Sequence, residues 1–226
     1  MADAPRLAVL VPAGGLGTRM GRQTPKQFLR LGGGPILAVT LRHFTSHPAV
    51  VAVVVAAPAA HVGRTRALVG RRRRPTVTVV AGGPTRQESV WRALQAAPLD
   101  VDIVVVHDAV RPFISRWLVD AVVAAASTEG AAICALPIAE TVKRVRDRLV
   151  ETTVDRAGLW AVQTPQAFRA AVLREAHEKA RRDGVVGTDE AMLVERLGHP
   201  VRVVPGLPDN IKITTPEDLR RARGRR

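Results

Sequence analysis

Three glycines and two cations lie close together in residues 12–28, PAGGLGTRMGRQTPKQF, directly after the apolar run LAVLV (7–11). These residues are Gly14, Gly15, Gly17, Arg19 and Lys26. Glycines allow backbone N–H groups to approach a ligand closely, and clustered N–H groups form a concave site for anions. The two cations add fixed positive charge, so we predict that this loop binds a polyanion.

Two familiar phosphate-binding loops do not fit the same segment. The dinucleotide fingerprint requires a third glycine where Met20 stands, and an acidic residue about 20 positions further on that is not found there. The Walker pattern requires lysine directly after its last glycine, whereas Lys26 stands between Pro25 and Gln27. The loop therefore belongs to neither of these two classes.

Further polar groups follow other strand-like runs, in GGPTR (82–86), HDAVRP (107–112), QTP (163–165), GTDE (187–190) and DNIKIT (209–214). They are rich in Arg, Lys and Thr but offer few general bases, and His107, at the tip of a strand, is expected to be an oriented structural histidine. A phosphate monoester is already an anionic nucleophile, so catalysis of its attack depends on positioning and charge stabilisation. These loops therefore suit transfer of a nucleotidyl group onto a sugar phosphate or polyol phosphate.

Apolar runs that alternate with helical patterns must position these loops. The expected strands are 7–11, 50–57, 76–81, 102–107 and 131–136, and the expected helices are 35–47, 58–70, 86–97 and 115–130. Near-continuous Val and Ile runs indicate strands buried on both faces of a parallel sheet, whose ligands bind beyond the carboxyl ends of the strands. The expected fold class is α/β: a single domain, 1–226, with a mainly parallel twisted sheet flanked by helices.

The pattern changes at residues 138–156, where two β-branched segments flank the polar turn RDRL. This predicts an extended β-hairpin arm that is too polar for the core and packs on a partner subunit. Residues 159–168 should return to the sheet, and a helix should cover 169–182. Thr188 is expected to cap the next helix, and Thr215, followed by Pro216, to begin the last one.

Composition limits the function classes. The 226 residues are 46% hydrophobic and 24% charged, as in an ordinary globular domain. The net charge of +14 suggests nucleic-acid binding, but much of the excess lies in RRRR (71–74) and RRARGRR (220–226). With four Phe, three Trp and no Tyr, few side chains are available for base stacking, so we expect a solvated basic surface and no nucleic-acid partner.

The single cysteine, Cys134, lies in the apolar run 131–136 and is expected to be a core residue rather than a nucleophile. One cysteine is compatible with a reducing compartment. The N-terminus, MADAPR, has no signal segment, and no run of 18 apolar residues occurs. We therefore expect a cytoplasmic protein that does not bind a membrane.

Eight motifs in order along the chain carry a resemblance that runs from about residue 7 to 219. They are PAGGLGTRM–PKQF, VAGGPTRQESV, VHDAVRPF, ETVKRV, TVDRAGLW, QTPQAF, GTDEA and DNIKIT. Together they are similar to 2-C-methyl-D-erythritol 4-phosphate cytidylyltransferase of the non-mevalonate isoprenoid pathway. The resemblance implies that the acceptor attacks the α-phosphate of CTP with Mg²⁺ as cofactor and pyrophosphate as leaving group. It also implies a single Rossmann-like nucleotidyltransferase domain and a homodimer whose arms reach into the partner's active site.

The resemblance further implies roles for individual residues. The catalytic residues would be Arg19 and Lys26, which stabilise the α-phosphate and the leaving pyrophosphate, and Arg156 and Lys212, which position the acceptor phosphate. The nucleotide would contact Pro12, Ala13, Gly14, Gly15, Gly17 and Ala109, with Gly82, Gly83 and Ser89 facing the cytosine. The acceptor would contact Asp108, Arg111, Thr164 and Thr188, with Thr141 and Arg156 supplied by the partner's arm. No side chain is assigned to the metal, because CTP phosphates are expected to hold most of the Mg²⁺ coordination.

Two positions depart from the family pattern: Gly14 and Pro84 stand where alanine and aspartate are expected, and Pro84 removes any side-chain hydrogen bond from there to the base. A ribitol 5-phosphate cytidylyltransferase shares the glycine loop, HDAVRPF and QTPQ, and remains an alternative. The arm sequence TVDRAGLW, together with GTDEA and DNIKIT, favours the methylerythritol enzyme. A non-catalytic nucleic-acid-binding protein is a more remote alternative, because it leaves the ordered motifs unexplained.

Overall fold

Strand β1 (Leu7–Pro12) lies inside a seven-stranded sheet with the order β11-β7-β10-β6-β1-β4-β5. The structure is a computed structural model that describes residues 4–15, 24–70 and 74–224. The other six strands are β4 (Val50–Ala57), β5 (Thr76–Ala81), β6 (Ile103–Val106), β7 (Ala131–Pro137), β10 (Trp160–Arg169) and β11 (Arg202–Pro205). Every pairing is parallel except those of β10, which runs antiparallel to both β6 and β7. The predicted mainly parallel sheet is confirmed.

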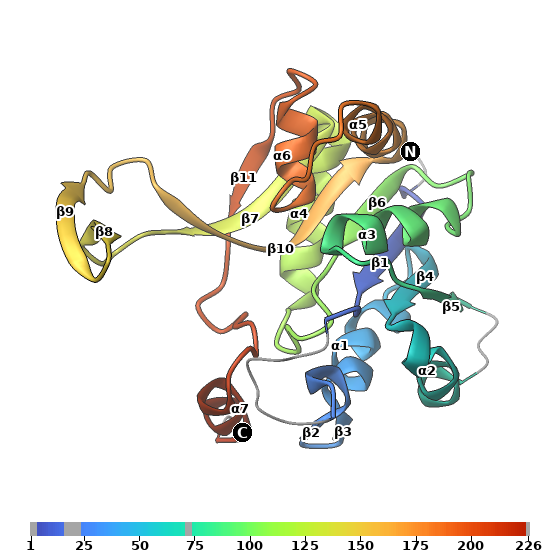
Figure 1. Cartoon of the computed structure of the whole chain (residues 1–226). Coiled ribbons are helices and arrows are strands. Elements are labelled where there is room, and N and C mark those ends of the chain that lie inside the picture. The colour runs from blue at the N-terminus through green and yellow to red at the C-terminus, as the bar shows by residue number, and fades with distance from the viewer. Residues whose placement is uncertain (1–3, 16–23, 71–73, 225–226) are drawn as a thin grey trace.

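Helices cover both faces of this sheet (Figure 1). Along β1, Leu7, Val9 and Val11 face α1 (Ile36–Thr45), α2 (Val62–Val69) and α4 (Arg116–Glu129). Ala8 and Leu10 face the opposite layer of α3 (Arg86–Gln95), α5 (Ala170–Arg182) and α6 (Glu190–Glu195). Because successive side chains of a strand point to opposite faces, an uninterrupted apolar strand fills two cores at once.

The expected helices begin and end close to the predicted positions, and side chains explain several of the starts. The hydroxyls of Thr85 and Ser115 accept the backbone N–H groups of Glu88 and Leu118 at the starts of α3 and α4. The predicted start of α7 (Pro216–Arg223) is also confirmed, with Thr215 in a capping box.

Thr188 is not the cap of α6, so that prediction was wrong. Asp189 is the N-cap residue, since its backbone is extended and its carboxylate accepts the backbone N–H of Met192 at 3.0 Å. A carboxylate one residue later in the chain takes the position predicted for the hydroxyl. The hydroxyl of Thr188 is thereby left exposed beside the helix start.

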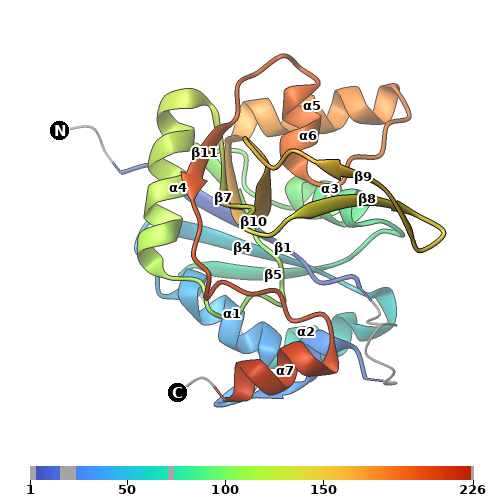
Figure 2. The ribbon, with the colours of Figure 1, turned by 90° about the vertical axis from the view of Figure 1, so that its left-hand side faces the viewer.

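Several short elements were not predicted. They are the 3₁₀ turns η2 (Lys26–Phe28) and η3 (Ala59–His61), the two-residue strands β2 (Arg30–Leu31) and β3 (Gly34–Pro35), and the edge strand β11. Each is too short, or too exposed, to carry a hydrophobic period. Helix α7 lies at the bottom of both views (Figures 1 and 2), where Figure 1 also labels β2. Leu219 and Ala222 of α7 pack there with Leu31 and Ile213.

The predicted arm is a two-stranded hairpin, β8 (Val142–Arg146) and β9 (Leu149–Val154), that projects from the body of the molecule (Figure 1). Asp147 and Arg148 form its turn with φ values of 49° and 66°. Positive φ at both central residues matches the twist of a two-residue hairpin.

Among the described residues, no helix has the length and apolar character needed to cross a membrane.

Candidate active site

A cavity opens beyond the carboxyl end of β1, where the loops after β5 and β6 also meet. Its walls are Pro12, Ala13, Gly14, Gly15, Lys26, Gln27, Gly83, Pro84, Thr85, Arg86, Ser89, Asp108, Ala109, Val110 and Lys212. Gln27 joins two parts of the wall, because its side-chain amide donates to the carbonyl of Ala13 at 2.8 Å. This bond holds η2, which carries Lys26, against the glycine loop.

Ser89 explains why glycines stand around it. Its hydroxyl donates to the Thr85 carbonyl at 2.9 Å and accepts the N–H of Gly83 at 3.1 Å. A Cβ atom would lie 2.9 Å from this hydroxyl oxygen at Gly82 and 3.1 Å from it at Gly14, and at Gly83 it would overlap the side chain of Glu88. At Gly82 and Gly83 the backbone can therefore lie this close to Ser89 and Glu88 only because these positions carry no side chain, whereas the contact at Gly14 is tight but would require only a small shift.

A second cavity adjoins the first on the side of β10. Its walls are Arg86, Asp108, Arg111, Val162, Gln163, Thr164, Gln166, Thr188, Asp189 and Lys212. Arg86, Asp108 and Lys212 line both cavities, so the two spaces share one wall.

Asp108 is surrounded by cations in this shared wall. Its carboxylate lies 3.0 Å from Lys212 Nζ, 3.2 Å from Arg111 Nε and 3.7 Å from Arg86 Nε. Burial opposes ionisation of Asp108, but Lys212, Arg86 and Arg111 outweigh it and hold its pKa below the ordinary value. The carboxylate is therefore charged at neutral pH, and it fixes the positions of the cations around it.

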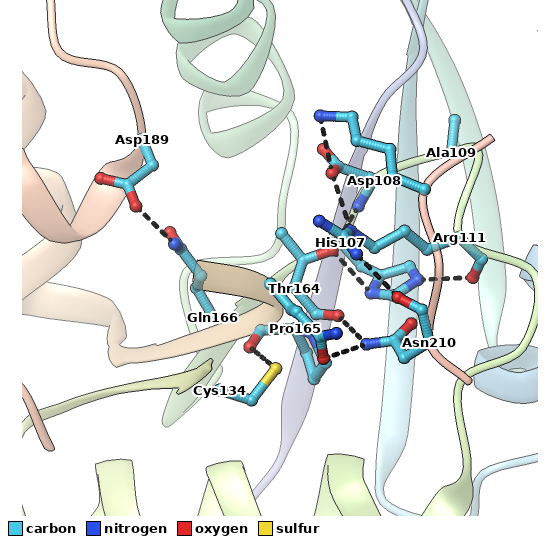
Figure 3. Close-up of polar contacts among 12 residues, drawn as sticks. His107, Asp108, Ala109, Arg111, Cys134, Thr164, Pro165, Gln166, Asp189 and Asn210 are labelled. Atoms are coloured by element: carbon cyan, nitrogen blue, oxygen red, sulfur yellow. Dashed lines mark hydrogen bonds and ion pairs between the residues drawn. The ribbon is translucent and has the colours of Figure 1, made fainter. Parts of the chain in front are cut away.

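His107 is buried behind Asp108 and is held in one tautomer (Figure 3). Nε2 lies 3.0 Å from the carbonyl of Arg111, which can only accept, so Nε2 carries the proton. Nδ1 then accepts from the Thr164 hydroxyl at 3.1 Å, and that hydroxyl accepts the N–H of Asp108 at 3.0 Å. Burial lowers the pKa of His107 to about 4. His107 is a neutral structural histidine, as predicted.

A buried asparagine attaches the C-terminal loop to the same wall. The side-chain amide of Asn210 donates to the carbonyl of Thr164 at 2.8 Å, and the Asn210 carbonyl accepts from Arg111 Nη1 at 2.7 Å (Figure 3). Two residues later in the chain, Lys212 reaches Asp108. The position of Lys212 therefore depends on a hydrogen-bond network that joins the loop to β10.

The two cavities bring together most of the predicted site residues. The first contains Pro12, Ala13, Gly14, Gly15, Lys26, Gly83, Ser89, Asp108, Ala109 and Lys212, and the second contains Asp108, Arg111, Thr164, Thr188 and Lys212. Gly82 packs behind Ser89 instead of lining a cavity. Thr141 and Arg156 are exposed at the arm and line neither cavity of their own chain. Gly17 and Arg19 lie outside the described residues.

The sequence places Arg86 among the cationic groups at the strand ends without a specific role, and it assigns none to Gln27, Glu190 or Asn210. Glu190 is buried and pairs with Arg86 at 2.7 Å. Asn210 and Gln27 stand inside two of the ordered motifs, yet a buried amide and an exposed one cannot be told apart from residue type alone.

Cys134 is buried as predicted, and burial raises the pKa of its thiol to about 12.

Comparisons with known proteins agree with this geometry. A family model described as 2-C-methyl-D-erythritol 4-phosphate cytidylyltransferase matches residues 7–224. The protein of that name from Symbiobacterium thermophilum is 50% identical over 218 residues, which cover 96% of this chain and 91% of that protein. The crystal structure of the protein of that name from Thermus thermophilus is similar with a TM-score of 0.80 and 40% identity, covering 96% of this chain and 97% of the other. The crystal structure of the Francisella tularensis protein of the same name is similar with a TM-score of 0.83 and 32% identity, covering 96% of this chain and 98% of the other.

Proposed function

The chain belongs to the 2-C-methyl-D-erythritol 4-phosphate cytidylyltransferase family, and on that premise we propose that its first cavity binds CTP and its second the acceptor. The enzyme transfers the cytidylyl group of CTP to 2-C-methyl-D-erythritol 4-phosphate in the non-mevalonate pathway, giving 4-diphosphocytidyl-2-C-methyl-D-erythritol and pyrophosphate. The observation that carries the proposal is the wall shared by the two cavities, since Asp108 and Lys212 face both. A phosphate bound at this wall can be reached from either side.

We assign the glycine-lined cavity to CTP because its walls combine close backbone with a cation. Gly14, Gly15 and Gly83 place main chain in the cavity wall, the space beside Gly15 is open, and Lys26 lies on the same wall. A positioned ammonium group stabilises the negative charge that develops on the α-phosphate and on the leaving pyrophosphate. Arg19 would add a second cation here, as the family pattern implies.

The second cavity suits a small polyol phosphate. Asp108 can accept hydrogen bonds from hydroxyl groups, Thr188 offers an exposed hydroxyl, and Lys212 can pair with the acceptor phosphate. In the reaction, an oxygen of this phosphate forms a bond to the α-phosphorus, and the bond from that phosphorus to the bridging oxygen breaks. The electron pair of the broken bond leaves with pyrophosphate.

The reaction places no demand on a general base. The attacking phosphate is already an anion at neutral pH, and repulsion between it and the triphosphate raises the barrier to its attack. His107 cannot remove a proton from it, because the ring is buried and both nitrogens are engaged within the protein. Catalysis by this chain therefore consists of positioning and charge stabilisation.

We propose that Mg²⁺ is bound mainly through the phosphates of CTP. Within the described ranges, no group of three or more His, Cys, Asp or Glu side chains is placed to hold a metal ion. The carboxylate of Asp108 is shared among three cations, although it remains the acidic group in the wall of the first cavity. Mg²⁺ commonly binds through substrate phosphates and waters with one or two carboxylates, where it neutralises phosphate charge.

We further propose a homodimer in which the arms exchange. Val145, Leu149 and Val150 of the hairpin are 53%, 73% and 61% exposed, and a two-stranded hairpin alone is marginally stable in water. A second copy of the chain would cover these side chains. In that arrangement Thr141 and Arg156 of one chain would serve the second cavity of its partner.

We also propose that the enzyme works in the cytoplasm. The sequence has one cysteine, which is buried, so the chain carries no internal disulfide and is compatible with a reducing compartment. Fractionation of cells that express the full chain tests this location.

The substrate assignment is tested by pyrophosphate release from each nucleoside triphosphate, with methylerythritol phosphate and ribitol 5-phosphate as acceptors. We expect rapid release only with CTP, methylerythritol phosphate and Mg²⁺ together. Comparable turnover of ribitol 5-phosphate would contradict the acceptor assignment, and release that is insensitive to added EDTA would contradict the Mg²⁺ assignment.

A further inference from the structure

Glu190, the first residue of α6, is a buried carboxylate that pairs with Arg86, the first residue of α3. Arg86 Nη1 donates to both of its oxygens, at 2.9 and 2.7 Å. Burial raises the pKa of Glu190, while Arg86 opposes that change, so the carboxylate depends on the arginine to remain charged. The two residues therefore form one unit that joins the start of α3 to the start of α6.

Stability alone does not account for such a pair. A buried ion pair commonly contributes little to folding, and replacement of both partners by apolar residues is often neutral or stabilising. Loss of one partner is different, because an uncompensated charge is then left in the interior. The pair is better explained by what it holds in place.

The segment 185–190 is fastened to α3 by Arg86 and by the residue that follows it. The side chain of Gln87 donates to the carbonyl of Val185 at 3.0 Å and accepts the N–H of Gly187 at 2.7 Å. Thr188, which lines the second cavity, stands inside this fastened segment. The start of α3 follows directly on the loop 82–85, part of which lines the first cavity.

Arg86 also reaches the shared wall itself. Its Nε lies 3.7 Å from Asp108 Oδ1, whereas Lys212 and Arg111 both contact Oδ2. The guanidinium thus lies between Glu190 on one side and Asp108 on the other. It lies at ion-pair distance from the oxygen of Asp108 that Lys212 and Arg111 do not contact.

We propose that Arg86, held by Glu190, is a positioning residue that fixes the wall of the second cavity relative to the first. It orients the Asp108 carboxylate and fixes the segment that carries Thr188, so that the acceptor phosphate faces the α-phosphate of CTP. The proposal rests on the assignment of the two cavities to CTP and the acceptor. Because Arg86 also lines the first cavity, the proposal predicts that loss of the pair lowers use of the acceptor more than it lowers the affinity for CTP.

The test uses three variants of the full chain: Arg86→Met, Glu190→Leu and the double variant. A displacement of about 1 Å can reduce a rate by about 10²-fold, so we expect kcat/KM for methylerythritol phosphate to fall about 10–100-fold in the double variant. CTP affinity, titrated with Mg²⁺ and no acceptor, should fall by a smaller factor, because the proposed displacement affects the second cavity. A single variant that fails to fold does not decide the question, because the double variant leaves no unpaired charge and is expected to keep its Tm.

The double variant Arg202→Met with Glu129→Gln is the matched control, since it removes an ion pair that lies outside both cavities. We expect it to keep the wild-type kcat/KM. The inference would be overturned if the Arg86→Met, Glu190→Leu double variant kept the wild-type kcat/KM, or if CTP affinity fell as much as acceptor use. Failure of the wild-type chain to use methylerythritol phosphate would instead contradict the proposed function.

Discussion

Lys212 Nζ lies 3.0 Å from Asp108 Oδ2, so the loop after β11 and the end of β6 meet through one ion pair in the wall of both cavities. The two side chains differ in access to solvent, since 40% of Lys212 is exposed but only 9% of Asp108. Asp108 keeps Arg111 and Arg86 as partners whether or not Lys212 is present. The lysine can therefore share its charge with a bound phosphate without isolating a buried carboxylate.

Lys212→Ala should lower kcat/KM for the acceptor by about 10²-fold, the scale expected when one preorganised charge-stabilising contact is lost. The Tm should change little, because Asp108 retains two cations. Steady-state kinetics and a thermal melt measure both effects. Arg220→Ala, an exposed cation on α7, is the control. Wild-type kinetics for Lys212→Ala would show that this lysine has no part in positioning the acceptor.

Lys26→Ala should lower kcat by about 10²–10³-fold with little change in stability. Lys26 lies in the wall of the glycine-lined cavity, where a fixed cation would face the phosphates of CTP. The measurement is kcat at saturating concentrations of both substrates. Arg30→Ala, an exposed cation two residues beyond η2, should leave kcat unchanged. An equal effect of both substitutions would indicate that net charge matters more than position.

Arg156→Ala and Lys26→Ala chains, each nearly inactive alone, should complement each other when mixed. If the arms exchange, a heterodimer has one site with both defects and one with neither. Random reassortment of equal amounts gives half heterodimers, so activity should recover to about a quarter of wild type. Native mass spectrometry must confirm that subunits exchange. Exchange without recovery would mean that Arg156 serves the site of its own chain.

The free energy of unfolding should fall as the pH falls from about 6.5 to about 4, because His107 and His177 are buried neutral. Burial lowers the pKa of each to about 4, below the value of 6.5 that applies when the chain is unfolded. The unfolded chain therefore binds more protons in this interval, and each histidine costs about 3 kcal/mol by pH 4.

Urea denaturation at pH 7, 5.5 and 4.5 measures this dependence. His177→Leu should make it shallower, since it removes one of the two groups and the ring nitrogens of His177 have no hydrogen-bond partner. His199→Gln changes an exposed histidine and is the control. A slope that is the same in wild type and His177→Leu would contradict the prediction.

Much of the fold could be predicted because it depends on local patterns. The apolar runs of β1, β4, β6 and β7 are continuous, so their burial on two faces can be recognised without a structure. The expectation of burial on both faces was wrong for β5, an edge strand that is mostly exposed or half-buried. The proline and threonine at the start of α7 are equally local signals. The prediction of Thr188 as cap failed, because the adjacent Asp189 also has a suitable oxygen and only backbone geometry separates the two residues.

The sequence by itself determined which residue types stand at the ends of the strands, and therefore that the site is cationic, glycine-lined and poor in bases. Only the tertiary structure decided which of these groups meet. The antiparallel insertion of β10 between β6 and β7 brings Thr164 to His107, and the buried pairing of Arg86 with Glu190 joins α3 to α6. Such contacts join residues far apart in the chain, and their free energy depends on burial and on the separation of the charged atoms. Neither quantity can be obtained from residue types and spacing, because both arise only when the layers pack.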